Sequence, residues 1–193
     1  MILRLVWITS LVVTNAACQP AIGGSQTKIT SWLDEPKPVS WNTAGLSVPV
    51  APRMSEAEDP RCRDLARPPE LEEDKRVRDR GWDLVGAYQG GWRIVVIRGT
   101  AGYDGMCRPR HYQDFVFVRG VFAGTLSPEP MDSRTDGALA RVSLQSESRL
   151  IAEYARYAAT DPLCCPTGTT SVTFDFGGDT PVLRPVFAST TRR

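Results

Sequence analysis

The feature that most constrains the fold is a series of short apolar runs, separated by turn residues, in the part of the chain beyond Gly81. The run Trp92–Arg98 contains an uninterrupted Ile-Val-Val-Ile stretch, which is typical of a buried strand. Arg119-Gly120 separates Tyr112–Val118 from Val121–Leu126 by two residues, which is the spacing of a tight hairpin. Because such runs follow one another with short connections, the sequence predicts an antiparallel meander.

One run, Arg149–Tyr157, is ambiguous, because its apolar residues also match helical spacing. A turn-rich corner, Thr160–Thr169, leads straight into the next strand pattern, and this favours a strand. The other expected strands are Leu84–Tyr88, paired with Trp92–Arg98 across a turn at Gln89–Gly91, then Ala138–Leu144, Thr169–Phe176 and Val182-Leu183.

A short helix is expected ahead of these strands. Pro68-Pro69 is followed by Glu70–Glu73, so proline lies in the first turn and acidic side chains lie at the positive end of the helix dipole. Gly81 is expected to end the helix. The predicted fold class is therefore α+β, mainly antiparallel β: a single small domain with a β-meander sheet and one short N-terminal helix.

The start of the chain predicts export and a lipid anchor. Arg4 precedes the apolar run Leu5–Val13, which is about half of the roughly 20 residues that a membrane-spanning helix needs. Cys18 follows two alanines and would become the first mature residue, carrying lipid on its sulfur. Asn15 departs from the lipid motif, which usually has Leu there. In the alternative, cleavage after Ala16 or Ala17 leaves Cys18 as an ordinary odd cysteine.

The expected organisation has three parts: a signal peptide over residues 1–17, a flexible tether over 18–60 and a mainly β domain over 61–190. Gly, Ser, Thr and Pro recur in the tether, which has too little apolar surface to offset the entropy of ordering. Trp32, Leu33 and Trp41 are exceptions that could dock on the domain or on the membrane surface. The expected location is the outer face of a membrane in the cell envelope, with the membrane as partner through the anchor.

The other four cysteines, Cys62, Cys107, Cys164 and Cys165, are expected to form disulfides, because an exported chain meets an oxidising compartment. A bond between neighbouring cysteines would need a strained ring. The favoured pairings therefore tie Cys62 and Cys107 to the Cys164-Cys165 corner, in either order. A zinc site that includes His111, the single histidine, is disfavoured because its ligands would lack the usual paired spacing.

The sequence predicts no catalytic residue, no cofactor and no metal site. It lacks a nucleophile elbow and a phosphate-binding loop, and His111 is expected to be a hydrogen-bonded surface residue. Without residues 1–17 the chain has 22 basic and 22 acidic side chains, so a nucleic-acid partner is not expected. The residues that could supply a hydrolytic carboxylate pair are Asp104, Asp114, Asp132, Asp136, Glu153, Asp161, Asp175 and Asp179.

Four aromatic residues, Trp82, Tyr88, Trp92 and Tyr103, lie near glycine-rich turns. We expect them to fill the core of a small β domain. The alternative is that they line a groove for sugar or peptide, because Tyr and Trp are favoured at interfaces.

The stretch Phe115–Ser127 (FVFVRGVFAGTLS), together with Tyr154–Phe174, resembles the LppP/LprE-type bacterial lipoproteins over roughly residues 82–186. The resemblance implies an envelope lipoprotein of unknown biochemical role and supplies no catalytic residues. The leading hypothesis is a non-enzymatic binding or structural module with an envelope protein or glycan partner. The alternatives are a small hydrolase with a carboxylate pair, and an inhibitor that binds protein through an exposed apolar patch.

Overall fold

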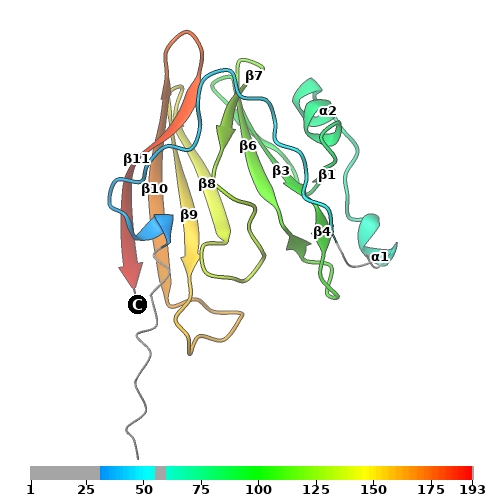
Figure 1. Cartoon of the computed structure of the whole chain (residues 1–193), viewed down its shortest axis with the longest axis vertical. Coiled ribbons are helices and arrows are strands. Elements are labelled where there is room, and N and C mark those ends of the chain that lie inside the picture. The colour runs from blue at the N-terminus through cyan, green and yellow to red at the C-terminus, as the bar shows by residue number, and fades with distance from the viewer. Residues whose placement is uncertain (1–30, 55–59, 193) are drawn as a thin grey trace, which may run out of the picture.

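The computed structural model describes residues 31–54 and 60–192, which form two antiparallel sheets that pack face to face (Figure 1). The first sheet has the order β1-β3-β6-β7, with β2 also paired to β3, and the second has the order β11-β10-β9-β8. A separate small ribbon pairs β4 with β5. The strands are β1 Asp83–Leu84, β2 Gln89–Gly91, β3 Ile94–Thr100, β4 Gly102–Tyr103, β5 Pro109–Arg110, β6 Gln113–Val118, β7 Val121–Thr125, β8 Leu139–Ser146, β9 Arg149–Arg156, β10 Gly168–Gly177 and β11 Val182–Arg192.

The tight hairpin between β6 and β7 is confirmed. Arg119 and Gly120 have φ values of 53° and 76°, the left-handed backbone that a two-residue turn of this kind requires. The predicted turn at Gln89–Gly91 is wrong, because these residues form β2 and pair with the start of β3. The chain turns instead at Trp92 and Arg93, where φ is 48° and 64°.

The second sheet is a meander of four consecutive strands, β8 to β11. Arg149–Arg156 is strand β9, so the choice of a strand over a helix is confirmed. Along β10 the buried side chains Val172, Phe174 and Phe176 alternate with partly exposed polar ones, because only one face of this sheet meets the core.

The first sheet is buried on both faces. On β6, Val116 and Val118 face the second sheet, whereas Phe115 and Phe117 belong to a second core on the opposite face. Helix α2, Glu72–Arg78, covers that second core through Val77, which confirms the predicted helix. Two shorter helical turns, η1 Trp32–Asp34 and α1 Pro60–Arg63, complete the elements. No described helix has the length and apolar character needed to cross a membrane.

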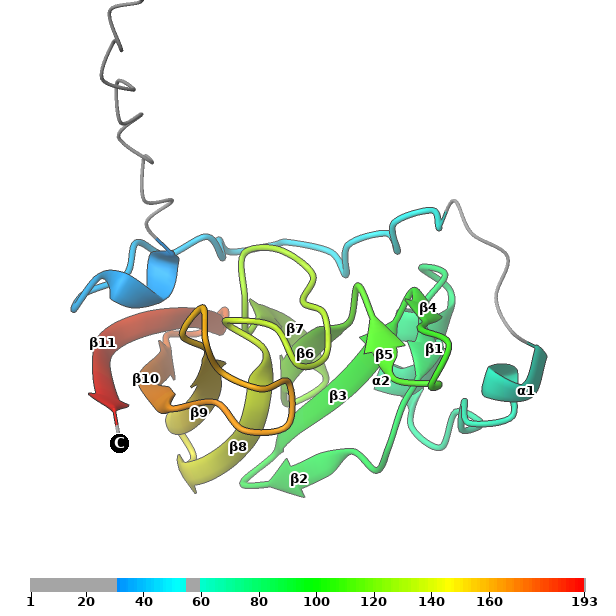
Figure 2. The same ribbon diagram turned by 90° about the horizontal axis from the view of Figure 1, so that it is seen from below.

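Residues 31–54, which we call the strap, cross the same side of both sheets (Figure 2). Buried Asn42 holds the strap: its amide donates to the carbonyl oxygens of Thr125 (3.0 Å) and Leu183 (3.1 Å) and accepts from the Thr125 N–H (3.0 Å). Gly124 makes room for this amide, since any Cβ there would overlap it. The flexible tether predicted for 18–60 is therefore wrong for the strap, and residues 18–30 lie outside the described residues.

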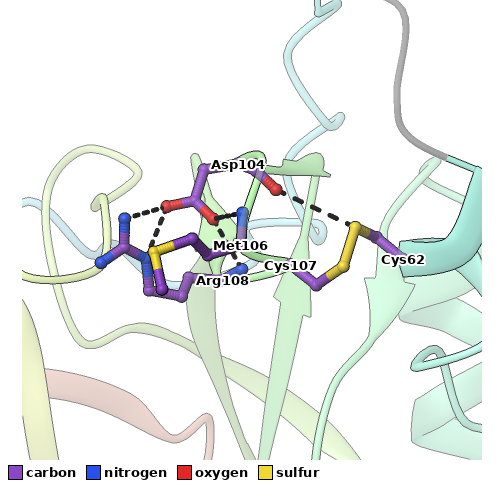
Figure 3. The surroundings of a disulfide bond; sticks show 5 residues. All are labelled: Cys62, Asp104, Met106, Cys107 and Arg108. Atoms are coloured by element: carbon purple, nitrogen blue, oxygen red, sulfur yellow. Dashed lines mark hydrogen bonds and ion pairs between the residues drawn. A yellow bond between two sulfur atoms is a disulfide. The ribbon is translucent and has the colours of Figure 1, made fainter.

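Both disulfides depart from the expected pairings. Cys62 bonds to Cys107, with Cα atoms 5.0 Å apart, and Cys164 bonds to its neighbour Cys165. The Cys164-Cys165 corner lies in the connection between β9 and β10 of the second sheet, whereas Cys62 is in α1 and Cys107 lies between β4 and β5, so the expected cross-links are not made. Around Cys107, the Asp104 carboxylate accepts from the backbone N–H groups of Met106 and Arg108, both at 2.9 Å, and so fixes the loop that carries the disulfide (Figure 3).

Candidate functional site

A groove of about 420 Å³ lies between the strap and the first sheet. The buried rings of Trp82 and Phe122 line it from the second core, and half-buried Trp41 lines it from the strap. Its volume is in the usual range for a site that holds a small ligand. The remaining lining residues carry no charge: Asn42, Leu46, Ser47, Pro49, Val50, Pro52, Gln113, Thr125, Pro128 and Pro130.

The walls of the groove are held in place by hydrogen bonds between the strap and the sheets. The Trp82 indole N–H donates to the carbonyl of Pro49 at 2.8 Å, and the Trp41 indole N–H donates to Thr125 at 3.1 Å. Arg80 adds a second bond by donating from Nε to the carbonyl of Val48 at 2.8 Å. The groove therefore exists in the folded chain because the strap is fixed at both its ends.

The buried polar side chains of the groove already have protein partners. Gln113 donates to the Ser127 carbonyl at 3.1 Å and accepts from the Ser127 hydroxyl at 2.5 Å. The Thr125 hydroxyl accepts from Trp41 and donates to the Ser127 carbonyl at 2.8 Å. With the Asn42 amide occupied as described, this interior presents apolar surface rather than free donors and acceptors.

Seven of the eight acidic residues expected for a hydrolase are engaged in separate structural contacts. Asp114 pairs with Arg98, Glu153 with Arg141, and Asp175 with Arg149. Asp104 and Asp161 accept backbone N–H groups within their own loops. Asp132 accepts the His111 backbone N–H, Asp136 pairs with Arg156, and Asp179 lies in the turn between β10 and β11. These described residues give no support to the hydrolase hypothesis.

Asp34 and Asp136 do approach each other, because both bind one guanidinium. Arg156 reaches Asp34 at 2.7 Å and Asp136 at 3.0 Å, and its side chain is 8 % exposed. The bridging arginine occupies both carboxylates, so neither is placed to act as a general acid or base. The arrangement fixes the beginning of the strap to β9.

The ion pair of Arg98 with buried Asp114 lies between the two sheets beside a small cavity of about 170 Å³. Burial raises the pKa of Asp114, and the positive charge of Arg98, at 3.1 Å, opposes that rise. Arg98 also lies over the ring of Tyr112, 4.7 Å from its centre. Arg98 and Asp114 therefore neutralise each other's charge where the two sheets meet, which is a structural role.

Of the aromatic residues singled out in the sequence, Trp82 and the partly buried Tyr88 both pack in the second core, as expected for core residues, whereas Tyr103 and Trp92 lie outside that core. Trp82 lines the groove, Tyr103 is buried, and Trp92 is exposed on the β2–β3 turn. His111 lies on the surface with Nδ1 at 3.5 Å from Asp132. Within the described part of the chain, no cluster of three or more His, Cys, Asp or Glu could hold a metal ion. Cys18 lies outside the described residues.

Sequence reasoning missed most of the groove. Trp41 was noted only as an exception in the tether, whereas Asn42, Phe122, Pro128 and Pro130 carried no signal. Two clues were available: Trp82, one of the aromatic residues that could line a groove, and the Gly-Thr of Gly124-Thr125, which receives the strap.

The fold and the groove define a small antiparallel β module that contains disulfides and a ligand-sized apolar site. Residues 89–179 match the LppP/LprE lipoprotein family, which confirms the resemblance expected from the sequence. None of the curated proteins and none of the solved structures compared with the chain matches it. The matched region supplies Gln113, Phe122, Thr125, Pro128 and Pro130 to the groove, and the strap supplies the opposite wall.

Proposed function

We propose that the chain is a lipid-anchored, non-enzymatic binding module of the bacterial envelope and that the groove is its binding site. The observation that carries this proposal is the groove itself: uncharged, lined by three aromatic rings and fixed by the strap. The relationship to a lipoprotein family supports an envelope location. The separate engagement of the acidic residues supports binding rather than hydrolysis.

The anchor is tested at Cys18. Cys18→Ala removes the sulfur that would carry lipid, so the protein is expected to move from the membrane fraction to the aqueous fraction. Membrane association that persists in this variant would contradict the lipid anchor. Cys164→Ser with Cys165→Ser serves as the control, because these cysteines lie in a loop of the folded part and their loss is expected to leave the location unchanged.

The binding site is tested with a charge at its rim. Val50 lines the groove and is 65 % exposed, so Val50→Glu is expected to block binding without unfolding the protein. Val39→Glu is the matched control, because Val39 lies on the same strap, is 87 % exposed and does not line the groove. Mass spectrometry of envelope components retained by each variant is expected to show losses for Val50→Glu only. Identical profiles for wild type and Val50→Glu would contradict the groove as the site.

A further inference from the structure

We propose that the ligand of the groove is a hydrocarbon chain, namely the acyl chain of a lipid in the membrane that holds the protein. This inference rests on the proposed function, because it names the ligand class of the same site. Three observations support it: the lining of the groove is apolar, its buried hydrogen-bonding groups are already paired within the protein, and the strap follows the expected lipid anchor closely in the sequence.

The groove offers apolar contact along its length. Leu46, Val50 and four prolines at positions 49, 52, 128 and 130 accompany the three aromatic rings. No lining side chain is charged, so nothing in the groove would fix a phosphate, a carboxylate or an ammonium group. A ligand gains here mainly by removing apolar surface from water, which is what a hydrocarbon chain does best.

The indole N–H groups of the groove are not available to hydrogen-bond a peptide. Recognition of a proline-rich peptide on an aromatic groove relies on side-chain donors that reach the peptide carbonyls. The two indole N–H groups of the groove donate instead to the chain itself, Trp41 to Thr125 at 3.1 Å and Trp82 to Pro49 at 2.8 Å. A peptide bound here would bury its carbonyls without partners, which is unfavourable.

A sugar would also lack hydrogen-bond partners among the buried side chains of the groove. The side-chain amides of Asn42 and Gln113 would be the natural partners of sugar hydroxyls, and both are bound to backbone groups of the protein. Ser47, the other hydroxyl of the lining, is on the exposed strap. The glycan partner considered from the sequence therefore fits this groove less well than a hydrocarbon does.

The position of the groove in the chain supplies the source of the ligand. Ser31, where the strap begins, is thirteen residues after Cys18, so a lipid on Cys18 would hold Ser31 within roughly 45 Å of the bilayer surface even with those residues fully extended. The strap then forms one wall of the groove. The segment that would connect the protein to the membrane is thus continuous with the site, and membrane lipids are the nearest abundant source of hydrocarbon.

The experiment uses a brominated long-chain fatty acid, because bromine quenches tryptophan fluorescence on contact, with the unbrominated acid as the blank. The protein is the exported Cys18→Ala chain, which lacks the lipid and retains the groove. Saturable quenching is expected. Val50→Glu is expected to weaken binding at least tenfold, and Val39→Glu is expected to bind within twofold of the parent chain. Circular dichroism verifies that both variants are folded.

Each other outcome overturns the inference. Absence of saturable quenching, or equal quenching in Val50→Glu and Val39→Glu, removes the acyl chain as ligand of the groove. Quenching in Cys18→Ala but none in the lipidated chain in nanodiscs made of brominated phospholipid would show that the protein's own anchor fills the groove. If envelope components depend on Val50 while fatty acid does not bind, the ligand class is wrong and the proposed function stands. If neither depends on Val50, both proposals fail.

Discussion

The two sheets of this protein differ in how many of their faces are buried. The second sheet meets the core on one face and exposes polar side chains on the other. The first sheet is covered on both faces, by the second sheet on one side and by α2 with the strap on the other. The comparison shows that the second sheet needs one partner and the first needs two, so the first sheet depends on segments that lie far away in the sequence.

The largest test of this difference compares two phenylalanines. Phe115 on β6 is fully buried, whereas Phe187 on β11 is 56 % exposed. Phe115→Ala is expected to lower the free energy of unfolding by about 4 kcal/mol, because it leaves a cavity between two layers. Phe187→Ala is expected to change it by less than about 0.5 kcal/mol. Urea denaturation measures both, and equal losses would contradict the comparison.

The two disulfides give the next test. Cys62–Cys107 closes a loop with a sequence separation of 45 beside the first sheet, whereas Cys164–Cys165 joins neighbours near the second. The chain-entropy account predicts a loss of roughly 3–4 kcal/mol for the Cys62→Ser, Cys107→Ser variant. No comparable loop is closed by the other bond, so Cys164→Ser with Cys165→Ser is expected to leave the melting temperature nearly unchanged. A larger shift for the second variant would show that the corner is structural.

A third comparison uses two glycines. Gly124 has φ 140° and faces Asn42, whereas nothing lies within 4 Å of a Cβ added at Gly177. Gly124→Ala is expected to cost about 2 kcal/mol through overlap and backbone strain, and Gly177→Ala much less. Adding Asn42→Ala to Gly124→Ala is expected to cost less than the sum of the two single changes, because the overlap is already removed. Additive losses in the denaturation cycle would contradict the contact.

The elements of the fold that could be predicted from the sequence are those set by residues close together in the chain. The β6–β7 hairpin and strand β9 were predicted because turn residues and apolar runs stand next to each other in the chain. The strap was missed because Asn42 finds Thr125 83 residues away, and such a contact leaves no periodic pattern nearby. The Cys62–Cys107 pairing was missed for the same reason, whereas the Cys164–Cys165 bond was set aside because a ring between neighbouring cysteines is strained. The turn at Trp92-Arg93 was hidden by the glycines just before it, which are in β2.

The smallest effect is expected from acid. The pKa of Asp74 is lowered, because hydrogen bonds from Arg67 and from the backbone of Glu70 and Leu71 outweigh the cost of burial. The pKa of Asp175 is lowered mainly by its hydrogen bond from Arg149. Unfolding releases both carboxylates to their ordinary pKa, so the stability they add is present at neutral pH and is lost as the pH falls below about 4.

Salt separates the two carboxylates. The Asp74 side chain is 0 % exposed beside the first sheet, and that of Asp175 is 40 % exposed on the second. In 1 M salt the loss of unfolding free energy on acidification is expected to be smaller. The reduction equals the contribution of Asp175, because salt screens its exposed ion pair with Arg149. Asp74→Asn is expected to remove most of what remains. Denaturation curves at pH 7 and pH 3, at low and high salt, measure the contributions of the two carboxylates. An unchanged pH dependence in Asp74→Asn would contradict the contribution assigned to Asp74.

The attachment of the strap through Asn42 also has a mechanical side. Any pull on the chain ahead of Ser31 enters the fold through the strap, and its hydrogen bonds to Thr125 and Leu183 carry that load across β7 and β11. The Arg156 bridge to Asp34 takes up the load first. Because the strap is one wall of the groove, a tension large enough to peel it from the sheets would also widen the groove and release what is bound there.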